Sequence, residues 1–465
     1  MYSLLFLGLV SAILALLLTP LVRNTARRLG VVDQPDQQRK LHGTPIPRVG
    51  GVAIFAAVIG SYCLLLAARL AAGAIVWDDL PLVLRILPAV AIVFGVGLAD
   101  DIVSLTPWKK LAGEVVAAIL AWFGGIHVGG LANFSFSGIV GFLVTLFWIV
   151  ACTNAINLID GIDGLATGVS LFAALTMLIA ALLNHNIPMA LAVVPLAGAL
   201  LGFLRFNFNP ASIFLGDCGS LTLGFLLGCC GAVWSEKSST LLGMTAPLLV
   251  LAFPLLDVGL AIVRRFLRGQ PIFAADRAHI HHKLLSKGLT PRRLVLIVYC
   301  ICGIGAAASL LLTAYHDTYR GFVIVLVCLA AWLGLQHLGY SEFSAARRVA
   351  LGGAFRTVLS AQLALEAFES EVGADITLQQ CWDLLCRTSP QFGFSGILFH
   401  LDDVVHQSGI ETGWQARIEF PGHGYISFWR GTGAGTRGAA AVLFVDCVSR
   451  TFQQKLCHLQ AVQPE

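Results

Sequence analysis

Asn154, Asn157, Asp160 and Asp163 recur at every third position between two long apolar runs. Polar side chains at the edge of a hydrocarbon-length segment cost free energy, so they usually face a cavity, a metal ion or one another. On a helix, this spacing places the four side chains in a stripe along one side. The stripe therefore predicts contact with a polar ligand at the membrane surface. The alternative is a polar loop with ordinary Asx-Gly turns.

A pair of acids and a lysine mark the boundary between two other apolar runs. Asp100 and Asp101 follow the first run, and Lys110 begins the second. Adjacent carboxylates can bind a divalent cation or serve as a base. Because acids at the C-terminal end of a helix oppose its dipole, we interpret the pair as functional. An ordinary solvated helix end is the alternative.

A lone acid opens a further apolar run. Asp217 lies between Gly216 and Gly219. One carboxylate with amide oxygens, completed by substrate phosphates, is a common way for proteins to hold Mg²⁺. The glycines would let the backbone approach an anion closely. The pattern predicts a metal or phosphate site at this position.

Two basic segments favour anion binding. His279, His281 and His282 lie within four residues, close to Arg277. Zinc ligands usually lie three to five residues apart and need further ligands, so the surrounding arginines favour phosphate over a structural metal. A second basic, turn-rich loop includes Lys40 and would suit a phosphate or a lipid headgroup. The alternative for that loop is an ordinary positively charged cytoplasmic segment.

The composition indicates which elements must position these residues. The chain is 57% hydrophobic and 12% charged, whereas a soluble domain carries about 25% charged residues. We therefore predict an all-α polytopic membrane protein with about eleven transmembrane helices and a small C-terminal cytoplasmic α+β domain. The expected spans are 2–22, 50–72, 84–99, 111–125, 138–153, 165–183, 188–204, 213–233, 242–263, 293–314 and 319–339.

The distribution of lysine and arginine predicts the orientation. These residues gather in one set of alternate loops, which also holds every polar cluster described above. The positive-inside rule then places the N-terminus outside and the C-terminus in the cytoplasm. Apart from Asp217, which belongs to a polar cluster described above, the acids within the expected spans are Glu114 and Asp257. Asp257 could line the floor of a cytoplasmic cavity or pair structurally with a neighbouring helix.

The chain divides into a membrane domain, 1–340, and a C-terminal domain, 341–465, in which apolar runs are shorter. We expect helices within 345–388 and a last helix near 447–460. Between them, strand-like runs occur at 396–401, 414–420, 425–429 and 440–445. This domain shows no pattern of residues that predicts catalysis.

Together the motifs resemble the polyprenyl-phosphate N-acetylhexosamine-1-phosphate transferases, a superfamily that includes the MraY translocases. The match covers about 25–300 in order and spacing, and 341–465 lie outside it. The motifs that carry it are the 33–51 loop, Asp100-Asp101 with Lys110, the 154–165 stretch, the Phe-x-Gly-Asp-x-Gly-Ser run at 214–220 and the 276–282 loop. The last loop is more similar to the WecA/TagO branch than to MraY.

The resemblance implies a cytoplasmic cleft in a protein of the bacterial inner membrane. It also implies transfer of N-acetylhexosamine 1-phosphate from a UDP-sugar to undecaprenyl phosphate, with release of UMP. N-acetylglucosamine is the commonest sugar in the WecA/TagO branch. Mg²⁺ would be the cofactor, with Mn²⁺ as an alternative ion.

The resemblance also implies a role for each matched residue. Asn157 and Asp217 would be the metal ligands, and Asp100 and Asp101 would serve the acceptor phosphate. Asp160, Asp163 and the histidine loop would hold the nucleotide sugar and its diphosphate. The substrate-binding residues would be Lys40, Lys110, Asn154, Arg277, His279, His281 and His282.

Three other functions are considered. One is an MraY-like phospho-MurNAc-pentapeptide transferase, and another is a transporter or lipid scaffold without catalytic activity. A CDP-alcohol phosphatidyltransferase is the third, but its Asp-Gly-x-x-Ala-Arg signature is absent because Leu-Ala-Thr follows Asp163-Gly164. The expected partners are the UDP-sugar, the lipid phosphate and the bilayer. A homodimer is left open, and no nucleic acid is expected.

Overall fold

The computed structural model divides the chain into two compact units, Met1–Leu338 and Gly339–Glu465. The structure describes residues 2–34, 45–70, 72–131, 134–237, 251–267, 280–315, 364–372, 377–401, 404–411, 413–431 and 438–461.

Eight helices among the described residues are long and apolar enough to cross a membrane. This finding confirms the prediction of a multi-pass helical membrane protein, although it does not confirm the expected number of eleven spans. The eight are α1 (Tyr2–Leu29), α2 (Gly50–Ala67), α4 (Leu80–Val103), α6 (Gly138–Ile159), α7 (Leu165–Leu183), α8 (Ile187–Asn207), α9 (Asp217–Lys237) and α13 (Pro291–Tyr315).

For three expected spans, the described residues contain no long helix of this kind. The span at 111–125 overlaps α5 (Pro107–Phe123), which has only 17 residues. The span at 242–263 is described only from 251 onward, where α11 (Ala252–Leu267) begins. The span at 319–339 lies outside the described residues.

The remaining elements of this unit are short. A seven-residue helix, α3 (Ala72–Asp78), connects α2 to α4, and another, α12 (Ile280–Ser286), precedes α13. Two small antiparallel pairs complete the unit. They are β1 (Val32–Asp33) with β2 (Ile46–Pro47), and β3 (Gly130–Leu131) with β4 (Phe134–Ser135).

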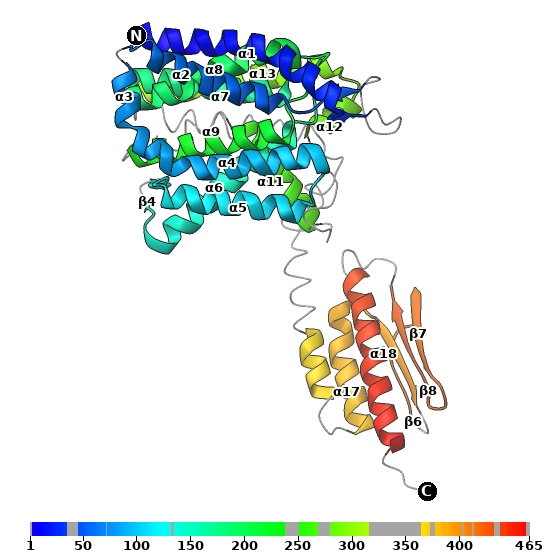
Figure 1. Ribbon diagram of the computed structural model, residues 1–465. Helices are drawn as coiled ribbons and strands as arrows, with labels where there is room; N and C mark the ends of the chain where they lie inside the picture. Colours follow the sequence, from blue (N-terminus) through cyan, green and yellow to red (C-terminus); the bar gives the residue numbers. More distant parts are fainter. Residues whose placement is uncertain are drawn as a thin grey trace. The chain divides into compact units, whose positions relative to one another are not determined.

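Helix α9 lies in the middle of the bundle, in contact with α4, α6, α2 and α7 (Figure 1). Most residues of α7, α8 and α9 are buried, whereas only a minority of the residues of α1, α4 and α13 are buried, as expected for apolar helices that face lipid. Helices α1 and α8 pack closely, and Gly198 and Gly202 of α8 lie against the α1 backbone. A Cβ on Gly198 would lie 2.2 Å from the Gly8 carbonyl oxygen, which is the small-residue packing used between membrane helices.

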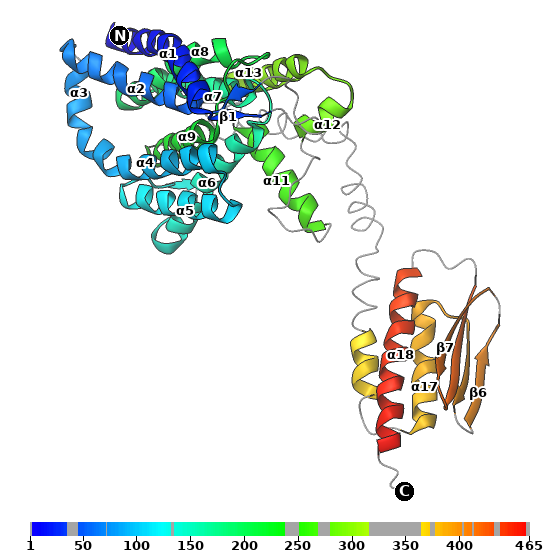
Figure 2. The same ribbon diagram turned by 45° about the vertical axis from the view of Figure 1, so that its right-hand side comes forward.

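The C-terminal unit is an antiparallel sheet with helices on one face (Figures 1 and 2). Its strand order is β6-β5-β8-β7. Phe399, Phe428, Phe444 and Phe452 are buried between the sheet and the helices. The described elements are helical residues 364–372, α17 (Leu378–Thr388), a 3-10 turn (Ser389–Phe392), β5 (Gly396–Leu401), β6 (Val404–Gly409), β7 (Trp414–Phe420), β8 (Gly424–Arg430) and α18 (Gly438–Ala461).

Two details of this unit differ from the predicted pattern. The run at 440–445, expected as a strand, is part of α18, whereas β6 was not expected. A short apolar run fits a strand and a buried helix equally well. The decisive signal lies further along the chain, because buried Phe444, Val448 and Phe452 recur every fourth residue. Strand β6 is mostly exposed and lacks an apolar run.

Candidate active site

The predicted polar residues of the membrane unit meet at one end of the bundle. Helix α4 ends just after the Asp100-Asp101 pair, and α5 begins just before Lys110. Helix α6 ends shortly after Asn157, and α9 begins at Asp217. Hydrogen bonds and ion pairs connect these four helix ends, so residues far apart in the sequence form one cluster.

Lys110 connects the two acidic segments. Its Nζ lies 3.4 Å from Oδ2 of Asp100 and donates a hydrogen bond to Oδ2 of Asp217. The other oxygen of Asp100 accepts the backbone N–H of Leu105 at 2.6 Å, which fixes the carboxylate as the chain leaves α4. All three charged side chains are only partly buried, so an ion or a phosphate can reach them.

Asp101 has a different environment from Asp100. Its two carboxylate oxygens accept the backbone N–H groups of Asp217, at 2.8 Å, and Cys218, at 2.9 Å. The residue is 3% exposed. An acceptor side chain at a helix start satisfies donors that have no partner within the helix, and its negative charge suits the helix dipole. Asp101 at the end of α4 therefore caps the beginning of α9.

Arg48 belongs to this cluster, although the sequence analysis included it only as part of the basic 33–51 loop and not among the predicted site residues. Its Nε donates to the carbonyl oxygen of Asp101 at 2.8 Å. One terminal nitrogen lies 3.4 Å from both the Asp100 carbonyl oxygen and the Ser104 hydroxyl. A single arginine in a basic loop gives no sequence signal of such contacts, because they depend on a helix end some fifty residues away.

The expected polar stripe is divided between a helix and a turn. Helix α6 ends at Ile159, and Asp160 to Gly164 form the turn before α7. Gly164 has φ +78°, a conformation that favours glycine and ends the helical path. Its carbonyl oxygen accepts the Tyr299 hydroxyl of α13 at 2.6 Å. A continuous helical stripe is therefore wrong.

The two asparagines of the stripe point toward neighbouring helices. Asn157 Nδ2 donates to the Ser220 hydroxyl of α9 at 2.9 Å. Asn154 Nδ2 donates to Glu114 of α5 and, at 3.0 Å, to the Val150 carbonyl oxygen. Glu114 is buried and was not among the expected site residues.

The two acids of the turn serve different contacts. Asp163 Oδ2 accepts the Asn209 side-chain amide at 3.0 Å and the Ala211 N–H at 2.9 Å, so it anchors the segment between α8 and α9. Asp160 lies close to other acids. Burial, followed by repulsion from three nearby carboxylates, raises the pKa of Asp160 well above its usual value.

The histidine loop is described only in part. His281 and His282 lie in α12, whereas Lys40, Arg277 and His279 lie outside the described residues. The backbone N–H of Ile280, the first residue of α12, donates to Oδ1 of buried Asp257 at 2.8 Å. This contact agrees with the structural alternative for Asp257, because α11 thereby holds the start of α12.

The donor set suits a loosely held Mg²⁺. Among the described residues, no three His, Cys, Asp or Glu side chains are grouped to hold a metal. Mg²⁺ does not require such a cage, because it usually takes one or two carboxylates and completes its shell with water and phosphate oxygens. Asp217 offers a carboxylate already paired with the Lys110 cation. Because Ser220 engages the Asn157 nitrogen, the amide oxygen is the atom that can accept a cation.

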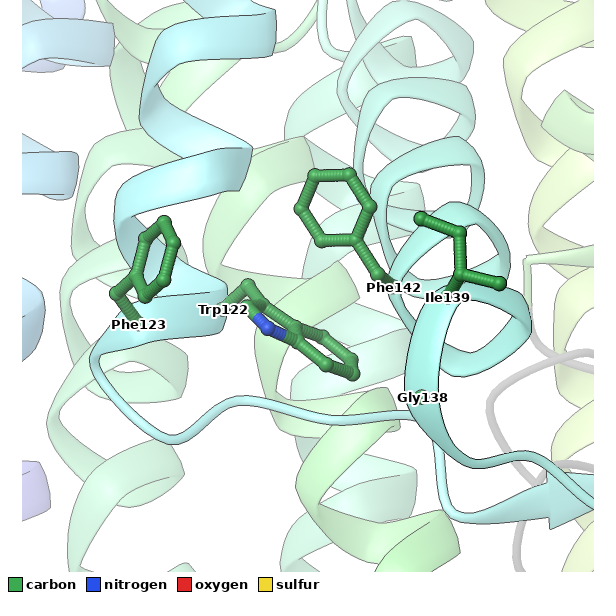
Figure 3. Close-up of a pocket in the computed structure, with 5 residues that line it drawn as sticks. All are labelled: Trp122, Phe123, Gly138, Ile139 and Phe142. Atoms are coloured by element: carbon green, nitrogen blue, oxygen red, sulfur yellow. The ribbon is translucent and has the colours of Figure 1, made fainter.

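The apolar pocket of Figure 3 is separate from this cluster. It has a volume of about 430 Å³ and lies at the last turn of α5 and the first turn of α6. Lys110 and Asn157 lie at the opposite ends of the same helices. Its lining residues are Trp122, Phe123, Gly138, Ile139 and Phe142. Aromatic side chains in this position are typical of a membrane interface.

Comparison with known proteins gives a family match and several similar relatives. Residues 83–235 match the profile of glycosyl transferase family 4. The chain is 36% identical over 324 residues to a Bacillus subtilis protein described as a probable undecaprenyl-phosphate N-acetylglucosaminyl 1-phosphate transferase. That alignment covers 68% of this chain and 87% of the relative.

Two further relatives show the same pattern. The decaprenyl-phosphate N-acetylglucosaminephosphotransferase of Mycobacterium tuberculosis is 38% identical over 335 residues, which cover 65% of this chain and 81% of the relative. The undecaprenyl-phosphate alpha-N-acetylglucosaminyl 1-phosphate transferase of Escherichia coli is 29% identical over 331 residues, with coverages of 67% and 84%.

Proposed function

The chain belongs to glycosyl transferase family 4, and from this membership we propose that it transfers N-acetylglucosamine 1-phosphate from UDP-N-acetylglucosamine to undecaprenyl phosphate. UMP is released, and the lipid-linked sugar begins a cell-envelope polysaccharide. The observation that carries the proposal is the meeting of Asp100, Lys110 and Asp217 at one end of the bundle, within residues 83–235, which match the family profile.

The proposed place of the reaction is the cytoplasmic face of the bacterial inner membrane. The loops at the site end of the helices are rich in lysine and arginine, which supports a cytoplasmic location. A nucleotide sugar is soluble and available there, whereas the acceptor is held in the bilayer. A cluster of charges at the ends of apolar helices is where the two substrates can meet.

The proposed chemistry is a direct displacement at phosphorus. An oxygen of the lipid phosphate attacks the phosphorus that bears the sugar, and the P–O bond to the uridylate phosphate breaks. The leaving UMP keeps the bridging oxygen and its electron pair. A phosphomonoester has a second pKa near 6 and is largely dianionic at neutral pH, so positioning matters more than a general base.

Each side chain near the displacement has a proposed task. Asp217 and Asn157 hold Mg²⁺, or Mn²⁺ in its place, which when bound supplies positive charge against the diphosphate. Lys110, already between the two acidic segments, turns its ammonium toward phosphate oxygens. Asp100 orients Lys110 through their 3.4 Å contact and so serves the acceptor phosphate indirectly.

Asp160, His281 and His282 are proposed to hold the donor, whereas Asp163 and Asn154 are proposed to act through neighbouring residues. Asp160 lies in the turn after α6, next to the cluster. His281 and His282 lie in α12, whose first residue is held by Asp257. Asp163 acts by anchoring the segment that leads into α9. Asn154 is proposed to contribute through the Glu114 pair beside Lys110.

The test is a transfer assay with the purified full-length protein in nanodiscs. We expect UMP release that requires both UDP-N-acetylglucosamine and undecaprenyl phosphate, together with a matching amount of lipid-linked product. UDP-MurNAc-pentapeptide and other UDP-sugars serve as donor controls. Absence of lipid-dependent UMP release with every donor would contradict the proposal, and preference for the pentapeptide donor would favour the MraY-like alternative.

The acidic residues provide the internal controls. We expect Asp217→Ala to lower kcat by about 1000-fold, because a metal ligand and a lysine partner are lost together. Asp100→Ala should be milder, at about tenfold, since a dianionic acceptor needs little base assistance. Near-normal turnover of Asp217→Ala at saturating Mg²⁺ would refute the metal assignment.

A further inference from the structure

We propose that Arg48 is a positioning residue of this site, which sets Asp217 in place by joining the end of α4 to the start of α9. The inference rests on the proposed function for its kinetic test but not for its structural test. Arg48 itself is half-buried, and its side-chain hydrogen bonds are with protein groups.

The side chain of Arg48 binds the end of α4. Its guanidinium meets the carbonyl oxygens of Asp101 and Asp100 and the hydroxyl of Ser104. The last carbonyls of a helix have no partner within the helix and carry the negative end of its dipole. A cation there offsets the unfavourable placement of two acids in the same turn. Arginine suits this task because its fixed fork can bind several oxygens at once.

Asp101 transmits this hold to the start of α9. Its backbone carbonyl is bound by Arg48, while its carboxylate accepts the N–H groups of Asp217 and Cys218. Arg48 therefore fixes the backbone of Asp101, and the Asp101 carboxylate in turn fixes the first amides of α9. Since the carboxylate is almost completely buried, this arrangement gives Asp101 a structural contact with Asp217 rather than a surface for substrate.

The backbone around Arg48 holds the turn that leads into α9. The Phe214 N–H donates to the Pro47 carbonyl oxygen at 2.8 Å, and the Gly50 N–H donates to the Phe214 carbonyl oxygen at 3.0 Å. Gly216 has φ +75°, and a Cβ there would lie 1.9 Å from the Arg48 carbonyl oxygen. The Arg48 segment thus contacts both α4 and the turn before Asp217.

A competing interpretation is that Arg48 binds a substrate phosphate directly. The two interpretations predict different results when a lysine replaces Arg48. A lysine keeps the positive charge for a phosphate, but it cannot make the three separate contacts of the guanidinium. They also differ in kinetics, because loss of a substrate contact raises KM, whereas misplaced catalytic groups lower kcat.

The structural test is hydrogen exchange of the full-length protein, with and without Arg48→Gln. We expect faster exchange in the peptide covering 214–220, which contains the two amides bound by Asp101, and unchanged exchange in the buried part of α8. Asp101→Asn should show the same local change. Arg28→Gln removes an equal charge from an exposed position on α1 and should leave 214–220 as in wild type. Unchanged exchange of 214–220 in Arg48→Gln would overturn the proposal.

The kinetic test uses the transfer assay on folded protein. We expect Arg48→Gln and Arg48→Lys to lower kcat by about 10- to 100-fold, with KM for the UDP-sugar within about twofold of wild type. Full activity of Arg48→Lys, or a rise in KM alone, would overturn the proposal in favour of phosphate binding. If wild type itself shows no transfer, the proposed function fails, and the exchange result alone decides the role of Arg48.

Discussion

Lys110 of α5 donates a hydrogen bond to the carboxylate of Asp217 at the start of α9, so a protein cation is paired with the acid proposed to hold a metal ion. The same ammonium lies 3.4 Å from Asp100. A metal ion and a lysine compete for one carboxylate, because each places positive charge at the same oxygens. An ion that binds Asp217 must therefore displace the Lys110 ammonium. The proposed new partner of that ammonium is a phosphate of the substrate.

Replacing Lys110 should separate metal binding from catalysis. In Lys110→Ala, we expect tighter Mn²⁺ binding, by roughly tenfold, because the competing cation and its repulsion are removed. Transfer should fall by about 100-fold, because the acceptor phosphate loses its cation. Mn²⁺ titration followed by electron paramagnetic resonance measures the first effect. Lys109→Ala, at the exposed neighbouring position, is the matched control, and weaker Mn²⁺ binding in Lys110→Ala would refute the competition.

Asp160 should make the metal-free protein less stable as pH rises. Its pKa is raised in the folded state, so ionisation costs more in the folded than in the unfolded protein. Its contribution to stability is fully present below the unfolded pKa, about 3.9, and is lost as pH rises through the folded pKa. Asp160→Asn removes this loss.

We therefore expect metal-free Asp160→Asn to have a higher Tm than wild type at pH 7 to 8, with the difference shrinking toward pH 4. Thermal scans in detergent with EDTA, at one fixed scan rate, measure it. Transfer by Asp160→Asn should nevertheless be reduced, because the acid is proposed to serve the donor. Parallel Tm curves for the two proteins across this pH range would show that Asp160 ionises normally.

Gly216→Ala should disrupt the site, whereas Gly95→Ala should not. Gly216 has a positive φ, and an added Cβ would meet the Arg48 carbonyl oxygen. Gly95, on the exposed face of α4, has no described atom within 4 Å of an added Cβ. We expect Gly216→Ala to cost at least about 1–3 kcal/mol in backbone strain, with a further loss from the clash. The yield of monodisperse protein and its transfer rate measure this, and equal behaviour of the two variants would contradict it.

The C-terminal unit should fold without the membrane unit. Its own core includes Phe399, Phe428, Phe444 and Phe452, and its sheet pairs only strands from within it among the described residues. We expect 339–465, expressed alone, to unfold cooperatively when followed by circular dichroism. Phe428→Ala should lower its stability by about 3–5 kcal/mol. A non-cooperative transition in the parent segment would show that it depends on the rest of the chain.

Apolar run length predicted most of the membrane fold, because a helix that crosses lipid must be long and apolar whatever its neighbours are. The same rule fails for α5. This helix has only 17 residues and buries Glu114. Its own sequence offers no obvious partner for that acid. The partner of Glu114, Asn154, comes from α6. Pairings between helices depend on packing, which the spacing along one helix does not reveal.

The candidate site was predictable as a set of residue types but not as a set of roles. Asp100 and Asp101 are adjacent and chemically identical, yet one meets Lys110 and the other caps α9. Successive residues on a helix point about 100° apart, so neighbours face different partners. Arg48 was missed for a related reason, since its partners are backbone oxygens, which carry no signature in a sequence.

The bond from the Asp217 N–H to Asp101 joins residues 116 positions apart. A ribosome completes α4 long before it reaches α9, so Asp101 enters the membrane before the amides it binds have been synthesised. During that interval, the acids at the end of α4 lack Asp217, the first residue of α9, which pairs with Lys110 and donates its N–H to Asp101. The site is therefore assembled late in biogenesis, and a nascent chain that stops before α9 carries most of the helices but no complete centre.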